Sequence, residues 1–163
     1  MFSRSTLAPA FALTLTLTAG AALAQVQAPE TKITPVAAVV HKAAPGLRIL
    51  EAELKEREDR RYFDVEGVLP GGAEIEFDLL ETGGTWKIVE TQRDIAWAAA
   101  PKLVRDTAAA SGKAIKPVRV IESKQADGML IYELFAAGKP EEPSMEVSLK
   151  DGQAKVLAEV WPH

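Results

Sequence analysis

The side chains that most often carry out catalysis are scarce in this 163-residue chain, which has no cysteine and only two histidines, His41 and His163. A serine nucleophile needs a base that is itself oriented by a third group, and no serine lies in a G-x-S-x-G sequence. Zinc sites need histidine or cysteine ligands at a characteristic spacing, which is absent here. We therefore predict that the protein is not an enzyme and uses no metal or cofactor. A hydrolase with paired carboxylates is the enzymatic alternative, since Asp and Glu are abundant.

Acidic side chains recur along residues 47–89, where apolar and polar residues alternate. A period of two predicts antiparallel strands that bury one face and expose the other. In this register one set of carboxylates points away from the preceding predicted helix, with Lys55 and Lys87 as the nearby cations: Glu51, Glu53, Asp64, Glu66, Glu74, Glu76 and Asp78. Like charges opposite each other across strands destabilise a sheet, so such a face contributes nothing to folding.

Two interpretations of these carboxylates stay open at the level of sequence. They form either a solvated surface that keeps an exposed sheet soluble, or a docking surface for a basic protein or peptide, where complementary charge raises association rate and selectivity. Hard cations such as Ca²⁺ also take several carboxylate oxygens, but the chain has no EF-hand spacing. We predict the seven residues as candidate partner-binding residues.

A second candidate partner-binding set lies in the C-terminal half, at Arg119, Ile131, Glu133, Leu157 and Trp161. These residues are expected on strands over 114–123, 129–136 and 154–160, on the face directed away from a second helix. Apolar residues mixed with charges on an exposed sheet are typical of a contact patch. The alternative is that the N-terminal half of the chain covers this face.

The elements that position these residues follow the same plan twice. Apolar residues at helical spacing predict one helix from Thr34-Pro35 to Pro45-Gly46 and another from Ala100-Pro101 to Ser111-Gly112. Strands follow each helix, and Asp151-Gly152 between the last two tolerates the positive φ angles of a tight hairpin. The repeated order predicts an α+β fold of two tandem units, each one helix followed by a three- to four-stranded antiparallel sheet. The units lie side by side, or they share one continuous sheet with both helices on one face.

The alternation also predicts which strand residues point into the core. In the first strand these are Leu50, Ala52 and Leu54, and in the strand after the second helix they are Val118 and Val120. Trp86 and Ile88 are expected inside at the end of the first unit. Trp97, between the units, is expected to fill space in the core.

The first residues have the pattern of a secretory signal peptide. Arg4 supplies a positive charge, Leu7 to Leu17 an apolar and Thr-rich region, and Ala22-Leu23-Ala24 a small-x-small cleavage site. The predicted organisation is a signal peptide over 1–24, a flexible lead over 25–34, a first unit over 35–95 and a second over 96–163. We expect a periplasmic or secreted protein with no membrane span after cleavage of the signal peptide, held together without disulfides.

The charge balance argues against nucleic acid as a partner. The formal net charge is -4, and removing Arg4 with the signal peptide makes the side-chain balance more negative. Binding to a nucleic acid backbone relies on an excess of Lys and Arg that neutralise phosphates. We therefore expect a protein or peptide partner, and a basic one would complement the charge of this chain.

The two units resemble PepSY and PepSY-like domains, including the relatives compared with beta-lactamase inhibitory protein. In the second unit the resemblance lies in Pro101 to Ser111, Val118 to Glu122, Gly128 to Leu134 and Met145 to Val156; in the first it lies in Val36 to Pro45, Tyr62 to Gly67 and Ile75 to Val89. Many PepSY sequences carry an Asp-x-x-Thr-Gly turn before the last strand, and this chain has Glu81-Thr82-Gly83-Gly84 and Lys150-Asp151-Gly152 instead. The resemblance implies an exported protein that binds or inhibits another protein, often proposed to be a peptidase, and it supplies no catalytic residue.

These observations predict an exported, non-enzymatic binding or inhibitor-like protein that acts through an open sheet face. The alternative is a small carrier that holds an apolar ligand between helix and sheet. The two differ in salt dependence, because only the first relies on complementary charge.

Overall fold

The computed structural model describes residues 30–139 and 142–158. Helix α1 (Glu30–Ala43) precedes four strands, and α2 (Lys102–Ala110) follows a short 3-10 turn (Trp97–Ala99) and precedes four more. The strands are β1 (Arg48–Arg57), β2 (Arg60–Val68), β3 (Glu74–Thr82), β4 (Thr85–Asp94), β5 (Pro117–Gln125), β6 (Leu130–Ala136), β7 (Met145–Lys150) and β8 (Gln153–Val156). Each of the two helices is therefore followed along the chain by four strands.

The eight strands form one antiparallel sheet in the order β1 to β8. The predicted fold of two tandem units, each with its own small sheet, is wrong because β4 pairs with β5, from Glu90 opposite Gln125 to Asp94 opposite Ile121. The chain leaves the sheet after β4, forms α2, and returns beside β4. This pairing satisfies an edge that would otherwise expose unpaired backbone groups, and it makes the sheet continuous.

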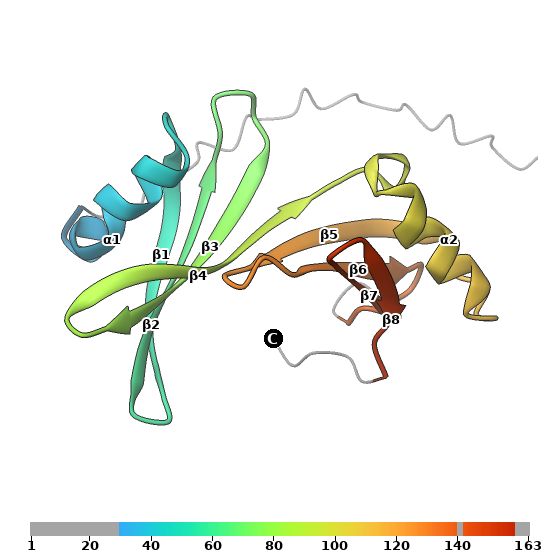
Figure 1. Ribbon diagram of the computed structural model, residues 1–163. Coiled ribbons are helices and arrows are strands. Elements are labelled where there is room, and N and C mark those ends of the chain that lie inside the picture. Colours follow the sequence, from blue (N-terminus) through green and yellow to red (C-terminus); the bar gives the residue numbers. More distant parts are fainter. Residues whose placement is uncertain (1–29, 140–141, 159–163) are drawn as a thin grey trace, which may run out of the picture.

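Both helices cover the same face of this sheet. Phe77 pairs with Thr91, Thr91 with Lys124, and Lys124 with Leu130. Directly paired residues project to the same side of a sheet. Phe77, at one end of this row, belongs to the core under α1, and Leu130, at the other end, packs against the core under α2. Figure 1 shows α1 and α2 at opposite ends of the strongly twisted sheet.

Each helix supplies one apolar stripe to its own core cluster. Val36 and Val40 of α1 are fully buried against β1 to β4, and Val104 of α2 is fully buried against the second half of the sheet. Trp86 packs on the first cluster and Trp97 on the second, as the sequence predicts. Fully burying a side chain such as valine stabilises a fold by about 1.5–3 kcal/mol, so the two clusters anchor the two ends of the sheet.

Helix α1 begins earlier than the sequence signal indicates. Pro35 was expected at the first helical position, but the helix starts at Glu30 and Pro35 lies within it. Residues 30–34, predicted as the end of a flexible lead, are the first residues of the helix. Ile33 is buried in the core under α1, and this burial favours the additional turn.

A β-bulge changes which side chains of β1 reach the core. Ile49 pairs with Gly67 and Glu51 with Glu66, so Leu50 is an extra residue on the β1 side. Ile49 is consequently buried in place of Leu50, which was expected inside, and Ala52 is buried as expected. Leu54 pairs with the core residue Phe63 and so lies on the expected face, but its side chain is not covered there. Leu54 is 42% exposed. A second irregularity, between Pro117 and Arg119, leaves Val118 exposed instead of buried, because a bulge reverses the alternation at its position.

Several predictions concern residues outside the described ranges, namely the signal peptide over 1–24 and Trp161. Within residues 30–139 and 142–158, neither helix has the length and apolar character needed to cross a bilayer.

Candidate functional site

The carboxylates predicted in the N-terminal half gather on the sheet face opposite α1. Two adjacent rows cross the strands there. In one row Glu51 pairs with Glu66, and Glu66 with Glu76. In the other Glu53 pairs with Asp64, Asp64 with Asp78, and Asp78 with Glu90. We call this surface the acidic face and define it by the following side chains: Glu51, Glu53, Asp64, Glu66, Glu74, Glu76, Asp78 and Glu90.

One cation relieves this concentration of negative charge. Lys55 forms an ion pair with Asp64 and lies 3.5 Å from the Glu53 carboxylate. The hydrogen bond from Lys55 to Asp64 raises the pKa of the Lys55 ammonium above its usual value. In the described part of the chain no second Lys or Arg comes within 4 Å of an acidic-face carboxylate. The rows therefore carry a large excess of negative charge.

Burial and neighbouring like charges raise the pKa of two carboxyl groups of β3. Burial, followed by the charges of Asp64, Glu90 and Glu76, raises the pKa of Asp78 to about 7. Burial and then the charge of Glu66 also raise the pKa of Glu76. Both side chains are only half-buried. Solvent and a ligand can consequently still reach these two carboxyl groups.

Glu90 is held in place by a polar chain that runs into β5. Its Oε1 accepts hydrogen bonds from the Ser123 hydroxyl and, at 3.2 Å, from Gln92 Nε2. Gln125 Nε2 donates in turn to Ser123 Oγ at 2.8 Å. These contacts fix the end of the second acidic row at the junction of the two halves of the sheet.

Three of the carboxylates are close enough to share one cation. Asp64, Glu76 and Asp78 can each place an oxygen within 4.8 Å of the others. Ca²⁺ takes six to eight oxygen ligands, so three carboxylates supply at most about six of them. Within the described residues this is the group whose geometry could hold a hard cation.

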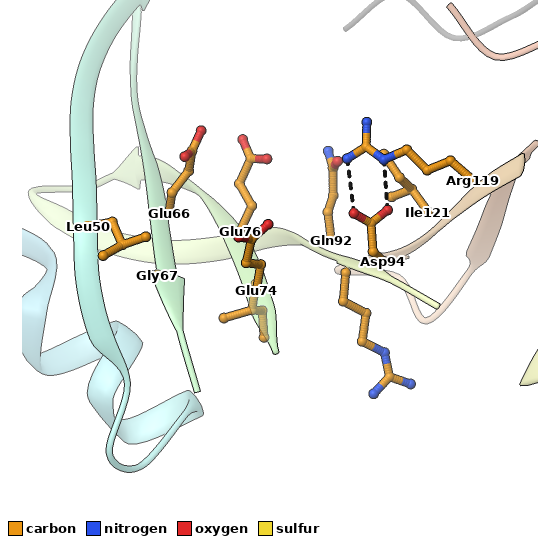
Figure 2. Close-up of a pocket in the computed structure, with 11 residues that line it drawn as sticks. Leu50, Glu66, Gly67, Glu74, Glu76, Gln92, Asp94, Arg119 and Ile121 are labelled. Atoms are coloured by element: carbon orange, nitrogen blue, oxygen red, sulfur yellow. Dashed lines mark hydrogen bonds and ion pairs between the residues drawn. The ribbon is translucent and has the colours of Figure 1, made fainter. Parts of the chain in front are cut away.

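A cavity of about 220 Å³ lies at the end of the first acidic row, where β4 pairs with β5. We call it the junction cavity. Carboxylates, two arginines and apolar side chains line this cavity together. The lining residues are Leu50, Glu66, Gly67, Glu74, Ile75, Glu76, Gln92, Arg93, Asp94, Arg119 and Ile121. Figure 2 shows Glu66, Glu76 and Gln92 projecting to the same side of the sheet as the Arg119–Asp94 pair.

The Arg119–Asp94 pair forms one wall of the junction cavity. Arg119 Nε donates to Asp94 Oδ1 at 2.9 Å, and Arg119 Nη2 donates to Asp94 Oδ2 at 3.2 Å. The guanidinium also lies over the Phe135 ring, 5.4 Å from its centroid. Two hydrogen bonds and one cation–π contact orient this side chain.

The two predicted sets of partner-binding residues differ in their exposure to solvent. Glu51, Glu53, Glu66 and Glu74 are exposed, and Asp64, Glu76 and Asp78 are half-buried; these seven do share one face. In the C-terminal half Arg119 is exposed and Leu157 is half-buried. Ile131 and Glu133, expected on an exposed patch, are only 4% and 2% exposed.

Three residues of the site were not among the predicted partner-binding residues: Glu90, Gln92 and Asp94. Trp86 and Ile88 point toward α1, and simple alternation would place these three polar residues on the same side. The pairing of β3 with β4 shifts register between Asp78 and Leu79, however, so Val89 is an extra residue and Glu90 falls opposite Asp78. The loss of apolar residues at alternate positions after Ile88 is the signal that could have revealed this reversal.

Comparisons of the chain with protein-family models, with characterised proteins and with solved structures give no match. The resemblance to PepSY-like domains stays a prediction from the residue pattern.

Proposed function

We propose that the protein is an exported, non-enzymatic binding protein of inhibitor-like type that captures a basic segment of a partner protein on the acidic face. The observation that carries the proposal is the pair of acidic rows, in which carboxylates lie directly opposite one another and Lys55 alone provides relief among the described residues. Export rests on the signal peptide predicted over 1–24, which would deliver the protein to the periplasm or the medium.

The rows are costly for folding and favourable for binding. Two unit charges 4 Å apart interact by about 1 kcal/mol in water and about 4 kcal/mol near a protein surface. Each opposed pair of carboxylates thus opposes folding, whereas a bound cationic side chain between the members of a pair attracts both. Such complementarity speeds association and discriminates against acidic partners.

The extent of the rows favours a protein segment over a single ion. Adjacent strands lie about 4.8 Å apart, so a row that crosses four strands spans about 14 Å. One cation can contact the group formed by Asp64, Glu76 and Asp78, but the carboxylates of β1 and β4 are not part of that group. A basic helix or strand of a partner presents several cations over that distance.

The apolar-carrier alternative gains no support from the junction cavity. Four carboxylates line that cavity, namely Glu66, Glu74, Glu76 and Asp94, and all four belong to the face opposite the helices. An apolar ligand between helix and sheet would need a cavity on the other side of the sheet.

The experiment is a titration of a fluorescent basic peptide, and of an acidic peptide of the same length, into the purified protein at low and raised salt. We expect binding of the basic peptide alone, weakened by salt. The variant E74Q/E76Q/D78N should bind at least about tenfold more weakly, a loss of roughly 1.4 kcal/mol.

A control variant separates the acidic face from net charge. E58Q/E142Q/D151N neutralises the same number of exposed carboxylates elsewhere on the protein. It should retain the wild-type affinity for the basic peptide. Equal losses in the two variants would show that overall charge, and not this face, governs the interaction, and the proposal would fail.

A further inference from the structure

The junction cavity has more negative charge than its own arginines neutralise. Arg119 is committed to Asp94 by two hydrogen bonds. Arg93 Nε and Nη2 contact Glu122 Oε1 at 2.8 and 2.6 Å, and Glu122 pairs with Tyr132 on the helix-covered face. Three lining carboxylates are left without an ion pair among the described residues: Glu66, Glu74 and Glu76.

The size and lining of the junction cavity suit one long, cationic side chain. Sites for drug-sized ligands occupy about 300–1,000 Å³, and this cavity of about 220 Å³ is smaller. Leu50 and Ile121 add apolar surface beside the carboxylates. A long cationic side chain packs its methylene groups on apolar surface while its charged end stays with polar groups.

The arrangement of acceptors favours arginine over lysine. Glu66 and Glu76 are direct partners across β2 and β3, and Figure 2 shows both side chains pointing the same way. Gln92 pairs with Glu76 in the next position of the row. Its Nε2 already donates to Glu90, which orients its Oε1 as an acceptor. A planar guanidinium with five donors can satisfy several such acceptors at once, whereas an ammonium acts as a single point charge.

We infer that the junction cavity binds one arginine side chain of the basic partner and thereby anchors that segment at the end of the acidic face. This inference rests on the proposed function and adds a sequence preference to it. The long acidic rows attract a basic segment in general, and the cavity determines which position of the segment is arginine. The fixed Arg119–Asp94 pair closes the cavity on the β5 side without adding net charge.

The test uses three short peptides of alternating Lys and Ala that differ only at the central position, which is Arg, Lys or citrulline. Citrulline keeps the shape of arginine and removes its charge. Their affinities are measured by fluorescence anisotropy, and the Ile121 methyl and Gln92 amide signals are followed by NMR. We expect the Arg peptide to bind roughly tenfold more tightly than the other two and to be alone in shifting both signals.

Two variants with the same change of charge locate the preference. Glu66 lines the junction cavity and Glu53 does not, and both are exposed carboxylates of the acidic face. E66Q should abolish the preference for the Arg peptide, while E53Q should weaken all three peptides by a similar factor and keep the preference. Neutralising either side chain relieves like-charge repulsion, so both variants are expected to fold.

The possible failures are distinguishable. If none of the peptides binds, the proposed function itself is wrong. If all three bind with equal affinity, or if E53Q and E66Q behave alike, the acidic face binds basic segments but the arginine anchor is wrong. Binding of N-acetyl-arginine amide as tightly as the Arg peptide would overturn the assignment to a protein partner, because the cavity would then be a site for a small guanidinium ligand.

Discussion

Neutralising Asp78 should stabilise the protein at neutral and alkaline pH, although the substitution removes a charge and adds no contact. Burial and the charges of Asp64, Glu90 and Glu76 raise the pKa of this carboxyl to about 7 from an ordinary value of 3.8. An unfolded chain ionises near the ordinary value, so folding at higher pH forces a charge into an unfavourable position. The variant D78N has the same shape and never acquires that charge.

The sign and range of the pH effect follow from the two pKa values. Below about pH 4 the carboxyl is protonated in both states, and its full contribution to stability is present. As the pH rises from about 4 to 7 the unfolded state loses its proton first, so the free energy of unfolding falls, and it changes no further above the folded pKa. The difference between 3.8 and about 7 corresponds to at most about 4 kcal/mol. Asp78 is half-buried, so solvent screening reduces the expected gain in D78N to about 1–3 kcal/mol.

The assay is urea unfolding of wild type and D78N, followed by tryptophan fluorescence, at pH values between about 4 and 8.5. D78N should match wild type at the acidic end and exceed it increasingly toward neutral pH. Glu142→Gln, at an exposed carboxylate in the loop between β6 and β7, is the control and should leave the profile unchanged. A constant difference between D78N and wild type at all pH values would refute the reasoning, because it would locate the effect in packing and not in charge.

Two further predictions concern the Lys55–Asp64 ion pair and the tightly packed Gly67 of β2. Replacing Lys55 by methionine keeps an apolar stem and removes the cation paired with Asp64. The variant should lower the free energy of unfolding by about 1 kcal/mol at low salt and by less at raised salt, because salt screens the ion pair; an equal loss at both salt concentrations in urea titrations would contradict this electrostatic account. Gly67→Ala should cost about 1–3 kcal/mol by overpacking, because a Cβ there would lie 2.7 Å from Leu47 Cδ1. Gly71→Ala, with no atom within 4 Å of the added carbon, is its control in thermal unfolding, and similar losses in both variants would count against a steric cause.

Local sequence signals located most elements and the acidic face. Helical spacing indicated both helices, and alternation indicated the strands that carry the seven predicted carboxylates. The hairpin between β7 and β8 was predicted from Asp151-Gly152, and both residues do have positive φ angles, 51° and 72°. These features depend on the conformational preferences of a few adjacent residues, so a single sequence suffices to predict them.

Alternation failed wherever a strand gains an extra residue. Leu50 and Val89 are such residues, and each reverses the faces of the residues that follow. A bulge arises from the pairing of two strands, and the sequence of one strand does not specify it. For this reason the contributions of Glu90 and Gln92 to the site, and the burial of Ile49, became visible only in the register.

The sequence by itself determined the order of elements, the two apolar stripes of the helices and the surplus of carboxylates at alternate positions, because these depend on local periodicity and charge. Only the tertiary structure decided that β4 and β5 join the strands into one sheet, that Ile131 and Glu133 are buried, and that Glu66 and Glu76 meet Arg119 and Asp94 around a cavity. The physical reason is that backbone pairing between strands far apart in the chain sets these relations, and the free energy of such pairing is distributed over many residues and is not encoded at any one position.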